Sequence, residues 1–398
     1  MSAAVEYDDL AGWLRLQLTN GIGNASARKL LAAFGLPEQI FQQSTNALRE
    51  VVTATQAQAL LQEPRGFAEA LRTTWAWLQA DPECRRVLPL GDPSYPPSLL
   101  HMEDPPVLLY GMGHAATWQP GRMDALRCVA VVGSRNPTPQ GASNAREFAQ
   151  ALAEAGLTIA SGLALGVDGA AHQGALDAMG ALGAADDSAH EQTATIAVVG
   201  TGLDRVYPKQ HLQLAKQIAA HGLILSEYPL GTPPLAAHFP QRNRIISGLA
   251  QGTLVVEAAL KSGSLITARL ALEQGREVFA IPGSIHSTQS RGCHALIKQG
   301  AKLVESAQDV LEELFATSPH AHSATSAHSA DLHDAHADLP EGPRAMLSAL
   351  GFDPTSLDAL QARTGLDTPH LQAELMALEL QGHVIRLPGG LFQRQAGT

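Results

Sequence analysis

A repeating succession of strand, glycine-bearing turn and helix between residues 128 and 281 constrains the fold more than any other feature of the sequence. Residues 128–132 form a short apolar run typical of a buried strand, a turn containing Gly133 follows, and residues 138–155 have helical spacing. Further strands are predicted at 158–160, 195–199, 222–225, 254–256 and 277–281, and further helices at 168–179, 208–220 and 265–274. This alternation predicts an α/β fold with a doubly wound parallel sheet of the extended Rossmann-like type.

The turns that follow these strands are rich in glycine and serine. In doubly wound sheets, ligands bind at the carboxyl ends of the strands. The turns expected at this edge are Gly133-Ser134-Arg135, Ser161-Gly162, Gly200-Thr201-Gly202 and Ser262-Gly263-Ser264. The last of these leads directly into a helix, whose free backbone N–H groups and positive dipole end favour an anion. The edge is therefore predicted to bind phosphate.

The segment His-Phe-Pro-Gln-Arg-Asn-Arg at residues 238–244 adds charge and an aromatic ring to this prediction. Arg242 and Arg244 carry guanidinium groups that match phosphate oxygens, and Phe239 offers a face for stacking. Phosphate binding combined with stacking indicates a nucleic acid or a nucleotide. A structural alternative stays open, in which Arg242 and Arg244 cap helix carbonyls while Phe239 fills the core.

The distribution of charge decides whether an acidic chain, with a net charge of −11, can bind a polyanion. Residues 205–302 contain 11 Lys and Arg against 4 Asp and Glu, whereas residues 303–398 contain 4 against 13. The positive charge therefore coincides with the predicted phosphate site. Charges beyond about 10 Å are screened at moderate salt, so the acidic remainder does not prevent binding.

Several classes of protein are disfavoured. The dinucleotide fingerprint G-x-G-x-x-G is missing after the first strand and the P-loop G-x-x-x-x-G-K-[ST] is missing throughout, so neither NAD nor a nucleoside triphosphate is predicted as a cofactor. Cys84, Cys128 and Cys293 lack the spacing of a zinc site or a disulfide framework. The start of the chain lacks a basic n-region, and no apolar run approaches the roughly 18 residues that span a bilayer. We therefore expect a cytoplasmic protein without cofactor or metal.

Two catalytic interpretations can be formed. Ser161, Asp168 and His172 are the residue types of a serine hydrolase, but the G-x-S-x-G elbow is missing, and the last two, four residues apart, more simply cap a helix and pack against the sheet. Glu257, at a strand end beside Ser262-Gly263-Ser264, is the more serious candidate because it lies next to the anion site and could polarise a ribose or base. It would make the chain a nucleotide phosphoribohydrolase-like enzyme.

The sequence divides into four predicted parts. Residues 1–85 are helical around a Gly-Ile-Gly turn and resemble SAM-like or helix-hairpin-helix modules, and residues 86–312 contain the sheet. Residues 313–338, rich in Ala, His, Ser and Asp, form a linker whose histidines are interpreted as spacer rather than metal ligands. Residues 339–398 have the pattern of a winged helix. Its third helix carries Asp367, Glu374 and Glu379 and no Lys or Arg, which favours a protein contact or dimer control over duplex DNA.

Several ordered motifs between about residues 90 and 305 resemble the DNA-processing protein A family, also called DprA or Smf. The motifs are Val132-Gly133-Ser134-Arg135, Ser161-Gly162-Leu163-Ala164-x-Gly166-x-Asp168-x-x-Ala171-His172, Arg242-Asn243-Arg244-Ile245-Ile246-Ser247-Gly248-Leu249, Val256-Glu257-Ala258 to Ser262-Gly263-Ser264-x-x-Thr267-Ala268, and Ile281-Pro282-Gly283. The resemblance implies a bacterial, non-enzymatic protein that binds single-stranded DNA, protects incoming DNA during natural transformation and helps load the RecA recombinase. It also implies a homodimer through the Rossmann-like domain, with single-strand-binding protein as a further partner.

The resemblance also assigns site residues. Arg135 matches the family's arginine that meets backbone phosphate, and Lys209 follows Tyr207-Pro208 at a position where the family often supplies a basic contact. The complete predicted single-strand site is Gly133, Ser134, Arg135, Ser161, Gly162, Lys209, Phe239, Gln241, Arg242, Asn243, Arg244, Ser262, Gly263 and Ser264. The chain departs from the family by an insert at 180–192 and an acidic tail. Because only 5% of residues are aromatic, phosphate contacts should dominate and binding should depend steeply on salt.

Overall fold

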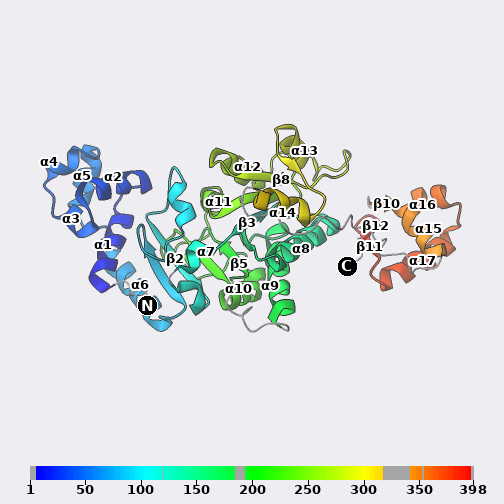
Figure 1. Ribbon diagram of the computed structural model, residues 1–398, viewed down its shortest axis with the longest axis horizontal. Coiled ribbons are helices and arrows are strands. Elements are labelled where there is room, and N and C mark those ends of the chain that lie inside the picture. The colour runs from blue at the N-terminus through cyan, green and yellow to red at the C-terminus, as the bar shows by residue number, and fades with distance from the viewer. Residues whose placement is uncertain (1–5, 120, 184–192, 317–340, 352–353, 396–398) are drawn as a thin grey trace. The chain divides into compact units, whose positions relative to one another are not determined.

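The computed structural model describes residues 6–119, 121–183, 193–316, 341–351 and 354–395 (Figure 1). The chain forms two compact units. One comprises Met1–Pro137 with Asn144–Leu314, and the other comprises Thr138–Ser143 with Phe315–Thr398. No helix in the described ranges is long and apolar enough to cross a bilayer.

The larger unit is built on a nine-stranded sheet with the order β1-β2-β6-β5-β4-β3-β7-β8-β9. The strands are β1 (Arg85–Pro89), β2 (Leu108–Gly113), β3 (Cys128–Val132), β4 (Thr158–Ser161), β5 (Thr195–Val198), β6 (Leu223–Ser226), β7 (Ala250–Val255), β8 (Glu277–Ala280) and β9 (Lys302–Leu303). From β6 to β9 all neighbouring strands are parallel, whereas β2 is antiparallel to both β1 and β6. The chain winds from β3 outward to β6, then returns and continues from β7 to β9. This reversal between β3 and β7 confirms the doubly wound α/β prediction.

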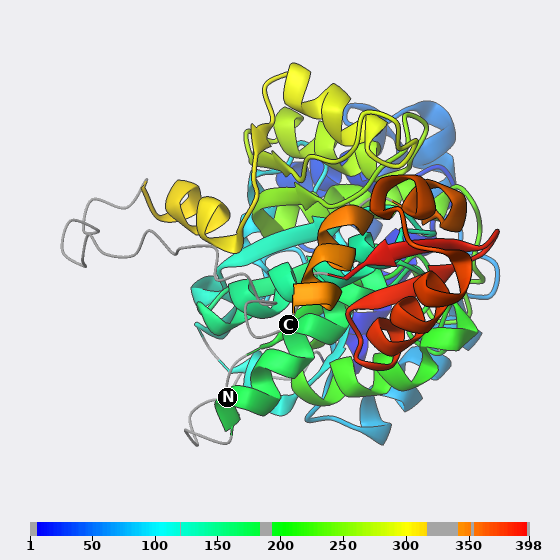
Figure 2. The ribbon, with the colours of Figure 1, turned by 90° about the vertical axis from the view of Figure 1, so that its right-hand side faces the viewer.

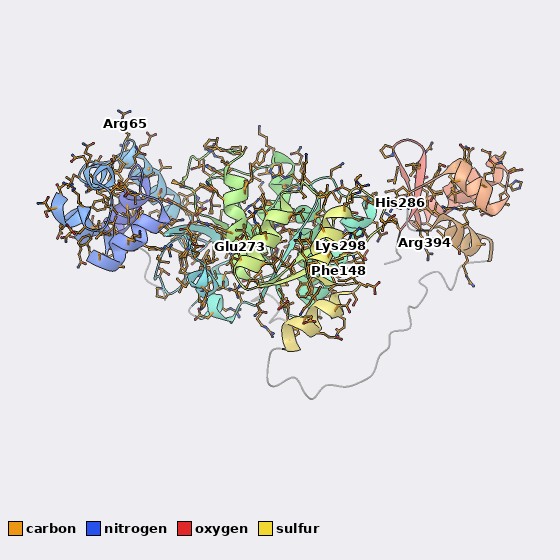
Figure 3. The ribbon with its side chains drawn as sticks, turned by 90° about the horizontal axis from the view of Figure 1, so that it is seen from above. Arg65, Phe148, Glu273, His286, Lys298 and Arg394 are labelled. Carbon is orange, nitrogen blue, oxygen red and sulfur yellow. The ribbon has the colours of Figure 1, made fainter. Side chains whose placement is uncertain are left out.

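Helices cover both faces of this sheet (Figures 1 and 2). On one face lie α11 (His238–Leu249), α12 (Ser264–Glu273) and α13 (Arg291–Lys298), and on the other lie α9 (Val167–Gly183) and α10 (Leu212–His221). The strands are apolar along their whole length because both faces are covered, and all five residues of β3 are buried. Figure 3 looks onto the layer of α11 to α13 and shows Glu273 and Lys298 at its outer surface.

Six helices precede the sheet: α1 (Tyr7–Leu18), α2 (Asn24–Phe34), α3 (Pro37–Phe41), α4 (Thr45–Arg49), α5 (Ala54–Leu60) and α6 (Phe67–Ala80). Their buried leucines, such as Leu10 and Leu30, belong to one hydrophobic cluster with Tyr110 of β2 and Ile218 of α10. The Tyr110 hydroxyl donates a hydrogen bond to Gln17 Oε1 at 2.8 Å. The N-terminal helices and one face of the sheet therefore share a core.

The smaller unit has the helices and hairpin of a winged helix, as predicted. Its elements are α15 (Glu341–Leu350), β10 (Thr355–Ser356), α16 (Leu357–Thr364), α17 (Thr368–Leu380), β11 (Val384–Leu387) and β12 (Leu391–Arg394), with the sheet order β10-β12-β11. Leu347, Leu360, Leu375 and Phe392 form its core.

Four strands were not predicted, namely β1, β2, β9 and the two-residue β10 of the smaller unit, and one predicted boundary is misplaced. The strands β1 and β2 precede the repeating pattern, and β9 has only two residues. The predicted linker starts too early, because α14 (Ala307–Ala316) includes residues 313–316 and buries Val310 and Leu314. The rest of the predicted linker, with its histidines, and most of the predicted insert lie outside the described residues.

Candidate nucleic-acid interface

A cavity of about 800 Å³ opens at the carboxyl ends of β3 and β7, where the strand order reverses. Its walls are the loop after β3, the loop after β7 and the first half of α11. Such a reversal leaves a crevice between loops that turn to opposite faces of the sheet, and ligands of doubly wound folds collect there. Nine of the predicted site residues line this cavity: Gly133, Ser134, Arg135, Phe239, Arg242, Asn243, Ser262, Gly263 and Ser264.

The loop after β3 is held rigidly and directs Arg135 outward. The Ser134 N–H donates to the Glu257 carbonyl at 2.7 Å, and the Asn136 N–H donates to Ser134 Oγ at 3.1 Å. A Cβ on Gly133 would lie 2.7 Å from Val167 Cγ2, so only glycine fits this close approach. The turn therefore presents an exposed arginine from a fixed backbone.

Arg135 forms a ledge with two aromatic side chains at the cavity. Its guanidinium carbon lies 5.5 Å from the centre of the Phe239 ring, and the Phe239 and Tyr207 rings are 5.5 Å apart and tilted by 39°. Tyr207 is 47% exposed, which leaves ring surface available to a base. Tyr207 was not predicted as a site residue, although its place two residues before Lys209 was an available signal.

The loop after β7 forms the opposite wall. Ser262 Oγ and Ser264 Oγ lie 2.7 Å apart, and Gly263 precedes α12 without a side-chain cap. Asn243 Nδ2 donates to the Gly263 carbonyl at 3.4 Å and so connects α11 to this loop. Lys261, a second lining residue that was not predicted, is exposed beside it.

Arg242 lies under the cavity and is only 3% exposed. Its guanidinium donates to the Gly162 carbonyl at 2.6 Å and to the Val198 carbonyl, at the ends of β4 and β5. Burial lowers the pKa of Arg242 to about 10, and the carboxylate of Asp168 opposes that shift. Arg242 therefore holds the ends of two strands together. This favours the alternative in which Arg242 has a structural role, although the carbonyls that it binds belong to the sheet edge and not to a helix.

Gln241 and Arg244 are not at this cavity, which corrects their predicted place. Arg244 forms ion pairs with Glu227 at 2.6 Å and Asp104 at 3.5 Å, and Gln241 Oε1 accepts from the Tyr228 hydroxyl at 3.1 Å. Both line a second cavity of about 440 Å³ between the N-terminal helices and the sheet. Helical periodicity is the reason, because positions 239, 242, 243 and 246 of α11 share one face, whereas 241 and 244 point elsewhere.

The remaining predicted residues lie around the cavity and not in its wall. Ser161 is fully buried, and its hydroxyl donates to the Val131 carbonyl at 2.7 Å. Gly162 touches Arg242 and lines a smaller pocket with Tyr207 and Arg135. Lys209 is exposed at the start of a short 3-10 helix, Lys209–His211.

The two catalytic interpretations find no support in this geometry. His172 is fully buried and its Nδ1 lies 2.7 Å from Thr195 Oγ1, while Ser161 is hydrogen-bonded to backbone. Asp168 Oδ2 accepts the N–H groups of Gly162 and Ala164 at 3.1 and 3.3 Å, so it holds the loop that precedes α9 and not the first turn of that helix, which corrects the expected capping role. Glu257 is not among the described residues that line the cavity.

The charged groups that line the cavity are three cations, Arg135, Arg242 and Lys261, and one carboxylate, Asp168. Burial raises the pKa of Asp168, and the guanidinium of Arg242 opposes that shift. Within the described ranges, Arg135 and Lys261 have no ion-pair partner. The cavity mouth is therefore positive and open to an anion.

Comparison with known proteins identifies the family of the chain. The chain matches the family model described as DNA recombination-mediator protein A over residues 86–315, and the DprA winged helix domain over residues 330–390. Protein Smf of Escherichia coli (strain K12) is 41% identical over 345 residues, which cover 85% of this chain and 84% of that protein. DNA processing protein DprA of Streptococcus pneumoniae (strain ATCC BAA-255 / R6) is 49% identical over 224 residues, covering 56% and 72%.

A solved structure gives the same result. The X-ray structure of DNA processing protein A (DprA) from Streptococcus pneumoniae superposes with a TM-score of 0.59 and 38% sequence identity, covering 76% of this chain and 97% of that one. The family model spans more than half of the chain, and Protein Smf matches most of both lengths. The chain thus belongs to the DNA recombination-mediator protein A family, the DprA and Smf proteins.

Proposed function

We propose that this protein binds single-stranded DNA in the cavity between the ends of β3 and β7, without turning over a substrate. The observation that carries the proposal is the ledge of Arg135, Phe239 and Tyr207 facing the Ser262–Ser264 loop across an open, positive cavity. A single strand needs cations for its phosphates and aromatic faces for its unpaired bases, and this arrangement offers both. The bases of a duplex are already stacked on each other, so single strands should bind more tightly.

In the cell, the bound strand would be protected and passed to the RecA recombinase during natural transformation. The family's description as a recombination mediator supports this role. Protection follows from the binding mode, because a strand whose phosphates lie in the cavity is less accessible to nucleases. RecA and single-strand-binding protein are the proposed partners, and the cytoplasm, where they act, is the proposed location.

A homodimer through the sheet domain is part of the same proposal. β9 is the last strand of the sheet, and Leu303 on it is 50% exposed. An edge strand offers unpaired backbone N–H and C=O groups to another chain. Sedimentation velocity of the full chain should give a dimer that Leu303→Glu dissociates.

The winged helix is proposed to contact protein and not duplex DNA. The exposed face of α17 carries Met376, which is 63% exposed, and Leu380, which is 80% exposed, beside Glu374 and Glu379. A helix that enters the major groove needs donors for bases and phosphates, and this face has apolar and acidic groups instead.

The test is fluorescence anisotropy with a labelled oligothymidylate and a duplex of equal length, each at low and at moderate salt. We expect Arg135→Ala to weaken single-strand binding about tenfold, or about 1.4 kcal/mol. The matched control is Arg65→Ala, which removes an exposed arginine from the N-terminal region (Figure 3). Absence of single-strand binding by the wild type at low salt would refute the proposal.

A second arm separates binding from catalysis. The wild type is incubated with AMP and the release of adenine is measured. We expect no release. Adenine release that disappears in Glu257→Ala would instead establish the phosphoribohydrolase-like alternative.

A further inference from the structure

A strand longer than the cavity must leave it over some part of the surface, and the exposed cations indicate where. α13 begins at the cavity wall, since Gln289, two residues before Arg291, is a lining residue. Gln289 Nε2 donates to the Asn136 carbonyl at 3.1 Å, and its carbonyl accepts the Ala258 N–H at 2.7 Å. The first turn of α13 is therefore fastened to the loops after β3 and β7.

The outer face of α13 carries two cations in line. Arg291 and Lys298 are seven residues apart, so they lie on one face of the helix about 10 Å from each other. The opposite face, with Gly292, Cys293 and Leu296, is buried against the sheet. Figure 3 labels Lys298, at the end of α13, and His286, in the loop before it.

Both cations are free to bind an anion. Within the described part of the chain, the side chains of Arg291 and Lys298 have neither a hydrogen bond nor an ion pair, and both residues are exposed. Acidic groups on neighbouring elements are engaged elsewhere: Glu273 with Arg269, Glu277 and Glu313 with Lys302, and Asp309 with the backbone N–H groups of Glu305 and Ser306. None of these four carboxylates is therefore paired with Arg291 or Lys298.

We propose that Arg291 and Lys298, which we call the α13 ridge, are a second contact segment for single-stranded DNA that continues the cavity beyond Lys261. The inference rests on the proposed function. A strand with its bases on the Tyr207 and Phe239 rings and its phosphates at Arg135 and Lys261 would pass next to Arg291 and then follow α13. A strand in a duplex carries one phosphate per about 3.4 Å, so the ridge is long enough for more than one phosphate.

The ridge makes affinity depend on strand length. An oligothymidylate of about 6 nucleotides would occupy the cavity alone, and one of about 25 would also reach the ridge. In Arg291→Ala/Lys298→Ala, we expect affinity for the longer strand to fall about tenfold and the salt slope of its binding constant to fall by about 1.4, since each phosphate contact of a single strand contributes about 0.7. Affinity for the shorter strand should stay unchanged.

A matched control removes the same residue types elsewhere. Arg72 on α6 and Lys216 on α10 are also exposed and, among the described residues, have no partner. Arg72→Ala/Lys216→Ala should leave affinity for both strands unchanged although the net charge falls equally. The exchange Arg291→Lys/Lys298→Arg should restore binding of the longer strand, because it keeps both charges.

The outcomes separate the two proposals. If the ridge variant and its control bind the longer strand equally well, or if the ridge variant loses the same factor for both lengths, the ridge is not a contact segment. If the wild type binds neither strand at low salt, the proposed function fails and the ridge fails with it.

Discussion

The interior of α11 and the mouth of the cavity use arginine in different ways. Arg242 is almost completely buried and holds the ends of β4 and β5, while Arg244 pairs with Glu227 and fastens the N-terminal helices. Arg135 at the mouth is exposed, and its guanidinium lies over the Phe239 ring. Arg242 and Arg244, in the basic segment of the sequence, therefore have structural roles. Arg135 is the arginine that is available to bind a phosphate. Substitutions in the two regions should accordingly affect stability and affinity separately.

The largest effect should come from Arg242→Ala. Its removal leaves the buried Gly162 and Val198 carbonyls without their charged donor, and each buried acceptor left without a partner costs about 1 to 3 kcal/mol. Urea unfolding measures the loss. Arg135→Ala should stay within about 0.5 kcal/mol of the wild type. Equal stability of the two variants would remove the distinction between the regions.

The second largest effect should be a loss of stability at acid pH, caused by the buried His172. Burial lowers the pKa of His172 to about 3, and its Nε2 has no hydrogen-bond partner among the described residues. The unfolded chain takes up this proton below its ordinary pKa of about 6.5, so the stability is present above that pH and is lost as pH falls toward 3. The wild type should lose about 1.4 kcal/mol per pH unit more than His172→Asn between pH 6 and 4. Parallel unfolding curves for the two proteins would contradict this.

At the mouth, Tyr207→Ala should weaken single-strand binding by about 1 to 3 kcal/mol, because it removes a stacking face. Tyr207→Phe keeps the ring and should bind like the wild type. Anisotropy with oligothymidylate gives both affinities. A loss in the phenylalanine variant would show that the hydroxyl, and not the ring, makes the contact.

The smallest effect should come from Lys261→Ala. This exposed cation contributes one phosphate contact, so the salt slope of binding should fall by about 0.7 while stability stays the same. Titrations at several salt concentrations measure the slope. A slope equal to that of the wild type would place Lys261 outside the path of the strand.

The sequence predicted the sheet well because its signals are local. The apolar run of β3 and the turn after it are visible without tertiary information, and the segments at Gly133–Arg135 and Ser262–Ser264 do meet at one cavity. The direction of each side chain on α11 was harder to predict from the sequence. The segment was interpreted as one pocket-lining stretch, whereas its helical conformation places Arg242 and Arg244 on different faces.

Other parts of the site depend on contacts between distant segments. Tyr207 becomes a site residue only because α11 brings Phe239 against it. Lys261 is an ordinary surface lysine until the loop after β7 is placed opposite Arg135. Likewise, the burial of Ser161 follows from its position at the end of a central strand, and its residue type gave no indication of this.

The hydrophobic cluster that joins α1 and α2 to β2 and α10 has a consequence for dissecting the protein. Tyr110 is completely buried and its hydroxyl reaches Gln17, so a fragment that starts at β1 would expose a large aromatic ring together with the neighbouring leucines. Such a fragment would expose an apolar surface and aggregate. Its failure to bind DNA would then say nothing about a role of the missing helices. Point substitutions in the intact chain are the better way to assign a function to each region of the protein.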